Sequence, residues 1–202
     1  MGSLFLIGGP MFSGKTSEIL RLLFNDAEIG LRVLYVNHKN DTRSSGPFST
    51  HNPLYKEKLS RESKVQFVSA ETLRELKVED FDVIGVDEAQ FFLDLKESVL
   101  DWVNSKKKKV IVSGLNGDFQ RNKFGELLDL IPHADSYLGL KSYCKICASP
   151  ELQKRCGCSQ KGYRIKEALF SHRLVQTTDQ VQVGGSETYV PVCRKCYNFL
   201  NK

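Results

Sequence analysis

A glycine-rich stretch near the start of the chain has the residues of a phosphate-binding loop. Residues 9–16, GPMFSGKT, match the pattern G-x-x-x-x-G-K-[ST] at Gly9, Gly14, Lys15 and Thr16. In such a loop the glycines let backbone N–H groups approach the phosphates, the lysine reaches the β- and γ-phosphate oxygens, and the threonine hydroxyl binds Mg²⁺. An apolar run precedes the stretch and a helical pattern follows it. It therefore predicts a nucleoside triphosphate site rather than a chance match in a turn.

An acidic pair follows a second apolar run. Residues 81–92 read FDVIGVDEAQFF, in which a strand-like segment ends at Asp87 and Glu88. A P-loop is usually served by an acidic residue at the end of another strand, so we expect Asp87 to hold Mg²⁺. Glu88 would then lie near the γ-phosphate, where a carboxylate can accept a proton from an attacking hydroxyl or water. The alternative is that the pair merely caps a strand.

The chain has six cysteines, all between residues 143 and 197. Those at 144 and 147, and those at 193 and 196, form C-x2-C pairs, which in a cytosolic protein indicate thiolate metal ligands rather than disulfides. Two such pairs suit tetrahedral zinc, and the long interval between them would make the metal clamp the base of a loop. Cys156 and Cys158 could compete as ligands, and reduced structural thiols remain the alternative for all six. The predicted zinc ligands are Cys144, Cys147, Cys193 and Cys196.

Apolar runs alternate with helical patterns through the first two thirds of the chain. The runs lack strict polar alternation, which indicates strands buried on both faces, and hence an α/β fold with a parallel sheet and flanking helices. After residue 140 the pattern changes to β-prone stretches, at 163–175, 181–183 and 188–192, rather than helices. We therefore predict a P-loop domain at residues 1–139 and a zinc-binding domain at 140–202. The expected strands are 4–7, 32–37, 65–69, 81–86 and 110–113, the expected helices are 15–29, 71–76, 95–105 and 125–130, and residues 39–59 are expected to form a mobile loop.

Composition is that of a soluble globular protein, with 41% hydrophobic and 26% charged residues among 202 and a net charge of +5. The chain contains no apolar run long enough to span a membrane and no recognisable signal peptide, so a cytoplasmic location is the default expectation. Lysines 106–109 are interpreted as a solvated helix end, because a nucleic-acid patch would be interleaved with aromatic residues. The four histidines are expected at the surface.

Two classes of protein combine these motifs. One is a phosphotransferase acting on a small hydroxyl substrate, and the other is a nucleic-acid motor, because GKT and DEAQ also occur in helicase ATPase cores. A helicase generally needs a second ATPase-like domain, and residues 140–202 leave too little chain for one. A regulatory or structural ATPase fits the motifs less well, because neither Glu88 nor the metal-clamped loop would have an evident function in it. The phosphotransferase is therefore favoured, with its substrate still open.

At this point the ordered set of motifs resembles one known family. GPMFSGKT, DTR, VDEAQFF, GLNGDFQRNKFG and the pair of C-x2-C knuckles look like the type II thymidine kinases, the cytosolic zinc-containing family, along residues 9–197. The resemblance implies transfer of the γ-phosphate of ATP to the 5′-hydroxyl of thymidine, and also of deoxyuridine, in pyrimidine salvage. It also implies that Glu88 is the general base and that Mg²⁺ is served by Thr16 and Asp87.

The resemblance carries over binding residues position by position. Around ATP these are Gly9, Pro10, Met11, Phe12, Ser13, Gly14, Lys15, Thr16, Asp41, Thr42, Arg43, Asp87, Glu88, Ala89 and Gln90. Around the nucleoside they are Met11, Phe91, Leu115, Phe119, Phe124, Ser171, Gln180, Val181, Gln182, Val183, Gly184 and Tyr189.

Further properties follow from the same resemblance. Residues 180–184 match a lasso segment whose backbone reads the base edge, which explains why a structural zinc would be placed at its root. The family implies a homotetramer inhibited by thymidine triphosphate, with no nucleic-acid or membrane partner. The chain departs from the family pattern at Ala89, Asn116, an insertion at 148–166, and the glutamines Gln180 and Gln182, which replace common apolar residues.

Overall fold

The structure is a computed structural model that describes residues 1–39, 65–152, 166–175, 180 and 184–201. Within these residues a six-stranded sheet has the order β3-β2-β4-β5-β1-β6, and every neighbouring pair is parallel. The predicted α/β fold is therefore confirmed. The strands are β1 (Ser3–Gly9), β2 (Val33–His38), β3 (Val65–Ala70), β4 (Val83–Val86), β5 (Lys109–Leu115) and β6 (Ser136–Gly139).

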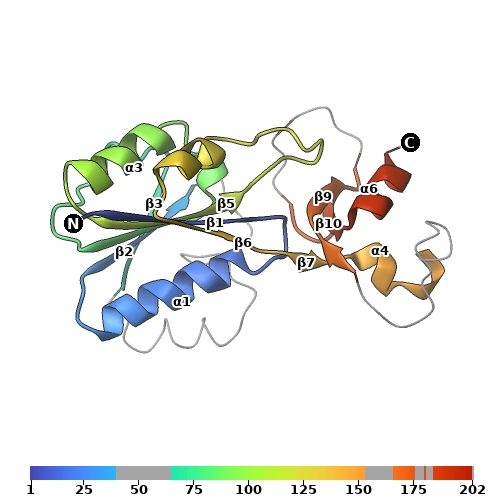
Figure 1. Ribbon diagram of the computed structural model, residues 1–202, viewed down its shortest axis with the longest axis horizontal. Helices are drawn as coiled ribbons and strands as arrows, with labels where there is room; N and C mark the ends of the chain where they lie inside the picture. Colours follow the sequence, from blue (N-terminus) through green and yellow to red (C-terminus); the bar gives the residue numbers. More distant parts are fainter. Residues whose placement is uncertain (40–64, 153–165, 176–179, 181–183, 202) are drawn as a thin grey trace.

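Helices cover the sheet on both faces (Figure 1). Helix α1 (Lys15–Glu28) lies on one face, while α3 (Leu95–Asn104) and the 3-10 helix η2 (Leu127–His133) lie on the other. Alternate residues of one strand enter different cores: Leu34 of β2 packs toward α3, and its neighbour Tyr35 packs toward α1. Both faces of the sheet are covered by helices, so the buried strands consist of continuous apolar runs. These runs are the pattern that predicted the strands from the sequence.

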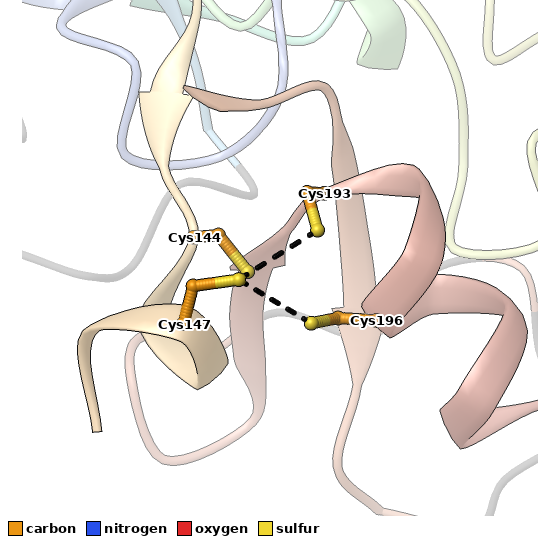
Figure 2. Close-up of side chains that lie close together, drawn as sticks. All are labelled: Cys144, Cys147, Cys193 and Cys196. Carbon is orange, nitrogen blue, oxygen red and sulfur yellow. Dashed lines mark hydrogen bonds between the residues drawn. The ribbon is translucent and has the colours of Figure 1, made fainter. Parts of the chain in front are cut away.

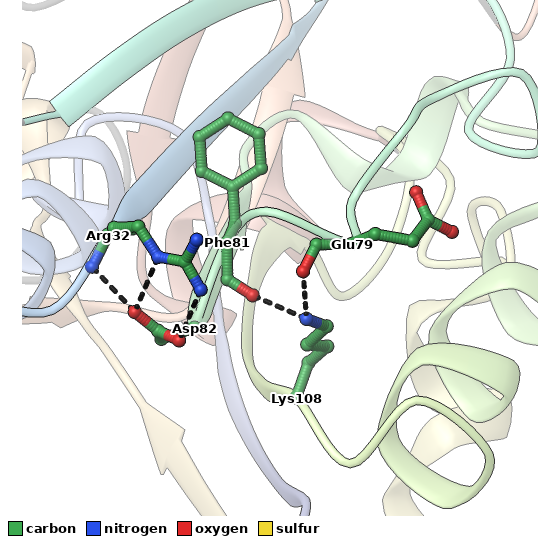
Figure 3. Close-up of polar contacts among 5 residues, drawn as sticks. All are labelled: Arg32, Glu79, Phe81, Asp82 and Lys108. Atoms are coloured by element: carbon green, nitrogen blue, oxygen red, sulfur yellow. Dashed lines mark hydrogen bonds and ion pairs between the residues drawn. The ribbon is translucent and has the colours of Figure 1, made fainter.

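Polar contacts fasten the amino edge of the sheet (Figure 3). The backbone N–H and guanidinium of Arg32, just before β2, donate to Asp82, just before β4. Lys108 Nζ donates to the carbonyl oxygens of Glu79 and Phe81, at 2.8 and 2.6 Å. The lysines that follow α3 thus have partners within the chain, and Lys109 likewise pairs with Asp26 of α1.

The last third of the described chain packs around its own small core beyond the carboxyl edge of the sheet (Figure 1). Strand β7 (Ser142–Tyr143) is antiparallel to β8 (Glu167–Ala168), and β9 (Phe170–Arg173) is antiparallel to β10 (Tyr189–Val192). Short helices α4 (Lys145–Ala148) and α6 (Arg194–Leu200) flank these strands. A domain boundary near residue 139 stays a prediction, since Leu140 packs on the α1 core and donates its N–H to the Gly8 carbonyl.

Several predicted elements differ from the structure. Residues 71–76 are not a helix, because the N–H groups of Leu73 and Arg74 both donate to the Asp94 carboxylate and the segment is too short to nucleate alone. The helix expected at 125–130 is the 3-10 helix η2, which starts two residues later because Gly125 is left-handed, with φ 65°. The expectation of strands without helices after residue 140 is wrong, since α4 and α6 occur there.

Strand β6 was missed for a different reason. It lies at the edge of the sheet beside β1, and its four residues are mostly exposed, so it lacks the apolar signal of the buried strands. The predicted strand at 181–183 and, apart from Lys39, the predicted loop at 39–59 lie outside the described residues. None of the described helices is both long and apolar enough to cross a membrane.

The contact between α1 and the sheet yields a stability prediction. A Cβ placed on Gly85 of β4 would lie 2.4 Å from Cδ1 of the fully buried Leu23. Leu23→Ala should cost about 2–5 kcal/mol of unfolding free energy through a cavity, and Gly85→Ala about 1–3 kcal/mol through overpacking. In the double variant the new methyl group occupies space that Leu23 vacated, so the loss should be smaller than the sum.

Chemical denaturation of the wild type, both single variants and the double variant measures this coupling. A coupling of more than about 0.5 kcal/mol toward stability is expected for residues in direct contact. Strictly additive losses would show that Leu23 does not limit the side chain at residue 85.

Candidate active site and metal centre

The glycine-rich loop joins the end of β1 to the start of α1, as predicted. Gly14, at the N-terminus of α1, has φ 85°, a left-handed conformation that suits glycine, and its carbonyl accepts the N–H of Glu18. Lys15 is buried, and its Nζ donates to the Pro10 carbonyl at 2.8 Å, as does the Ser13 hydroxyl. The loop therefore folds around its own lysine, and the helix N-terminus that follows it favours an anion there.

The acidic pair lies at the carboxyl end of β4. In the sheet, β5 separates this strand from β1, which leads into the glycine-rich loop. Asp87 is only 2% exposed, and its carboxylate accepts the Tyr35 hydroxyl at 3.0 Å and the Glu88 N–H at 2.9 Å. Burial and repulsion from Glu88 raise the pKa of Asp87 above its usual value, while a smaller hydrogen-bonding contribution from the Thr16 hydroxyl opposes the shift. A buried carboxylate beside a hydroxyl is a hard oxygen donor set of the kind that Mg²⁺ prefers.

Glu88 is held in an unusual backbone conformation. Its φ of 51° and ψ of 40° are left-handed, which costs a non-glycine residue about 1 kcal/mol and is a kind of strain that recurs at active sites. The turn leads into the 3-10 helix η1 (Ala89–Phe91). There Gln90, 3% exposed, donates from Nε2 to the Glu88 carboxylate at 2.6 Å and accepts the Leu115 N–H at 3.0 Å. Gln90 thus ties the carboxylate to the end of β5.

Residues predicted around the nucleoside come together from distant parts of the chain. The N–H of Met11, in the glycine-rich loop, donates to the hydroxyl of Ser171 on β9 at 2.9 Å. The Phe91 and Phe124 rings meet edge to face, with centroids 5.8 Å apart. The remaining described members of this set are Leu115, Phe119, Gln180, Gly184 and Tyr189, of which Tyr189 is buried and Phe119 half-buried.

Several predicted site residues lie outside the part of the chain that the structure describes. Asp41, Thr42, Arg43, Val181, Gln182 and Val183 lie outside the described residues, as do Cys156 and Cys158. The expectation that the histidines are at the surface is wrong for His38, which is buried at the end of β2. The centroid of its ring lies 4.7 Å from that of Phe92 and 5.6 Å from that of Phe91. His38 therefore packs against Phe91, one of the predicted nucleoside residues.

The four cysteines of the C-x2-C pairs meet in one buried cluster (Figure 2). Their sulfur atoms all lie within 4.8 Å of one another, and Cys147 Sγ is 3.8 Å from Cys193 Sγ and 3.7 Å from Cys196 Sγ. Zinc–sulfur bonds of about 2.3 Å in a tetrahedron put sulfurs about 3.8 Å apart. The cluster could therefore hold zinc.

Each pair spans the first turn of a helix, which brings its two sulfurs to the same side. Cys144 precedes α4 and Cys193 precedes α6, as their N-terminal caps. Burial raises the pKa of Cys147, as does the Cys144 thiol. Burial also acts to raise the pKa of Cys193, but hydrogen bonds from the Cys196 backbone and from the surrounding thiols lower it to about 7. One sulfur of the cluster is thus prepared to ionise near neutral pH.

Sequence reasoning missed other residues in this region. Tyr35 supports Asp87 from β2, and Arg173 on β9 contacts Phe119, Tyr189 and Gln180. A signal for Arg173 was present, because it follows Ser171 by two positions in a predicted strand and must share its face.

A strand, glycine-rich loop and helix beside an acidic strand end, all at the carboxyl edge of a parallel sheet, define a P-loop protein of the nucleotide-binding class. The family model described as thymidine kinase matches residues 2–197. The chain thus belongs to the thymidine kinase family, and the resemblance seen in the sequence is confirmed.

Similar proteins share the whole length of the chain. It is 33% identical over 199 residues to the thymidine kinase of Amsacta moorei entomopoxvirus, covering 97% of this chain and 98% of that protein. It is 34% identical over 200 residues to the thymidine kinase of raccoon poxvirus, covering 97% of each. Thymidine kinase 1 of Dictyostelium discoideum is 32% identical over 199 residues, covering 98% of this chain and 78% of that protein.

Among solved structures, the flagellar accessory protein FlaH from Methanocaldococcus jannaschii aligns with a TM-score of 0.49 and 16% identity. The alignment covers 70% of this chain and 72% of that chain.

Gln90 offers a test of the site's construction. Gln90→Leu leaves the partly buried Leu115 N–H without its acceptor, so we expect a loss of about 1–3 kcal/mol in unfolding free energy. Gln120→Leu is the matched control, since Gln120 is exposed and its side-chain oxygen accepts an exposed hydrogen bond from Asn122, and its effect should stay within about 0.5 kcal/mol. Equal effects in urea unfolding would show that the bridge between Glu88 and Leu115 contributes nothing.

Proposed function

We propose that this chain transfers the γ-phosphoryl group of ATP to the 5′-hydroxyl of thymidine, with deoxyuridine as a second substrate, in pyrimidine salvage. The observation that carries the proposal is the match to the thymidine kinase family from residue 2 to residue 197. The geometry supports it, because the P-loop and the Asp87–Glu88 pair meet at one edge of the sheet.

The phosphate side of the reaction is assigned to residues of the first two motifs. The backbone of residues 9–14 and the Lys15 ammonium would bind the β- and γ-phosphates, with Asp41, Thr42, Arg43, Ala89 and Gln90 completing the ATP site. Thr16 and Asp87 would hold Mg²⁺, whose chemistry is to neutralise charge on the phosphates. Glu88 accepts the proton of the 5′-hydroxyl, the hydroxyl oxygen bonds to the γ-phosphorus, and the bond to the β-phosphate oxygen breaks to release ADP.

The nucleoside side is assigned to residues of both the P-loop part and the C-terminal part of the chain. Phe119 would contact the thymine base and Tyr189 would end the lasso segment, with Met11, Leu115 and Ser171 around the thymine 5-methyl group. The hydrogen bond from Met11 to Ser171 supports this assignment, because it joins the phosphate-binding loop directly to β9. Phe91, Phe124 and residues 180–184 complete the proposed nucleoside site.

A structural zinc ion would complete the C-terminal part. The buried sulfurs fit zinc in number and spacing. The segment that includes residues 180–184 runs from Cys147 to Cys193, so both of its ends lie at the cluster. Such a metal would stabilise that segment at its root rather than take part in the chemistry. We further propose a cytoplasmic homotetramer, inhibited by thymidine triphosphate, with no nucleic-acid or membrane partner.

The role of Glu88 gives the first test of the function. Glu88→Gln should lower kcat by about two to four orders of magnitude while leaving ATP binding intact, because it removes the proton acceptor alone. The assay is ³²P transfer from Mg-ATP to each deoxynucleoside in turn. Glu97→Gln is the matched control and should behave as the wild type, because the Glu97 side chain is 83% exposed on α3.

Selective labelling of thymidine, with deoxyuridine second, supports the proposal. Near-normal turnover by Glu88→Gln would remove Glu88 from the role of base. If no nucleoside is labelled and DNA or RNA stimulates ATP hydrolysis, the chain is instead a nucleic-acid-dependent ATPase.

The metal gives the second test. Elemental analysis of the purified protein should find one zinc per chain, and Cys144→Ser should lose most of it, since three sulfurs bind zinc more weakly than four. The KM for thymidine should then rise more than the KM for ATP. The double variant C156S/C158S is the control and should retain its zinc. If the control lost its zinc while Cys144→Ser kept it, the zinc ligands would be other cysteines than the four proposed.

A further inference from the structure

Arg173 is a buried cation at the junction of the predicted nucleoside residues. It is 5% exposed on β9, two positions after Ser171. Its guanidinium carbon lies 3.8 Å from the ring centroid of Phe119 and 5.4 Å from that of Tyr189. These distances correspond to stacking on Phe119 and a looser cation–π contact with Tyr189.

The Arg173 guanidinium also donates hydrogen bonds to polar groups. One nitrogen of Arg173 donates to the Tyr189 hydroxyl at 3.0 Å and to the Gln180 carbonyl at 2.9 Å. Arg173 therefore contacts residues from three separate parts of the chain: the loop after β5, β10 and residue 180. All three belong to the proposed nucleoside site.

Gln180 is fastened a second time through its side chain. Its amide donates to Asp118 Oδ2 at 2.9 Å and to the Lys123 carbonyl at 3.4 Å. The other oxygen of Asp118 accepts the N–H groups of Gln120 and Asn122, both at 2.9 Å, and so shapes the loop that carries Phe119. A leucine or valine at residue 180 could not make these bonds, so the glutamine at this position serves the loop rather than the base.

We propose that Arg173 is a positioning residue for nucleoside binding, which holds the Phe119 ring, the Tyr189 hydroxyl and the Gln180 carbonyl in one fixed arrangement. The inference rests on the proposed function, since it assumes that these three residues contact the nucleoside. Arg173 acts through them, because it stacks on the Phe119 ring and donates to the Tyr189 hydroxyl and the Gln180 carbonyl. Gln180 assists by linking the same arrangement to Asp118.

The proposal predicts a selective loss of nucleoside affinity. Arg173→Leu should raise the KM for thymidine by about tenfold or more, the effect of losing a charged hydrogen-bond donor, while kcat and the KM for ATP change by less than about twofold. Arg173→Lys should fall between the wild type and Arg173→Leu, because an ammonium can stay over the Phe119 ring but cannot replace the planar guanidinium fork. Gln180→Leu should raise the KM for thymidine by a smaller factor.

Arg194→Leu is the matched control. Arg194 also lies over an aromatic ring, 4.9 Å from the Phe170 centroid, but it is exposed at the start of α6 and makes no contact with Phe119 among those found in the described residues. It should behave as the wild type. Zinc content and Tm are measured for every variant, so that loss of the fold is separated from loss of positioning.

Each outcome decides the proposal. A thymidine KM raised alone, with partial rescue by Arg173→Lys, supports it. An unchanged thymidine KM, or thymidine and ATP KM values raised together with a lower Tm, would make Arg173 merely structural. If Arg173→Leu does not fold, Arg173→Lys and Gln180→Leu decide in the same way. Failure of the wild type to phosphorylate any nucleoside would instead refute the proposed function itself.

Discussion

Parallel pairing places the carboxyl ends of all strands at one edge of the sheet, and the rest of this molecule depends on that constraint. The glycine-rich loop follows β1, the acidic pair follows β4, and β5 lies between these strands. Groups far apart in the chain therefore meet without long connections. The burial of both sheet faces makes this edge rigid, because no strand can shift its register without moving its side chains from one core to the other.

At that edge, short polar links set the position of the acidic side chains. Tyr35 holds Asp87 from the neighbouring strand, and Gln90 joins Glu88 to the end of β5. Glu88 takes a left-handed backbone conformation to fit this arrangement. The surrounding sheet compensates the local strain, which is how a stable scaffold supports an unfavourable conformation at a site. The chemistry proposed for Glu88 depends on these neutral partners as much as on its own charge.

The C-terminal part has too small an apolar core to rely on packing alone. Its cysteine cluster is part of that core, and polar and aromatic contacts join the described residues of this part to the P-loop side. Met11 reaches Ser171, Tyr197 reaches the Phe119 carbonyl, and Arg173 stacks on Phe119. A metal at the cluster would therefore help to set the position of β9 and β10, and with them that of the residues proposed to bind the nucleoside.

Local patterns in the sequence determined the motifs and most of the central elements. The P-loop, the acidic pair, the cysteine pairs and the buried strands β1, β2, β4 and β5 could all be predicted, because glycine spacing and apolar runs act over a few residues. The exposed edge strand β6 and the cysteine-capped helices α4 and α6 could not, since their residues carry no strong local preference. Only the tertiary structure decided that Gln90 bridges Glu88 and Leu115, that His38 is buried, and that Arg173 joins Phe119 to Gln180. Such contacts join residues up to 54 positions apart, as Arg173 and Phe119 are, and only packing of the folded chain brings them together.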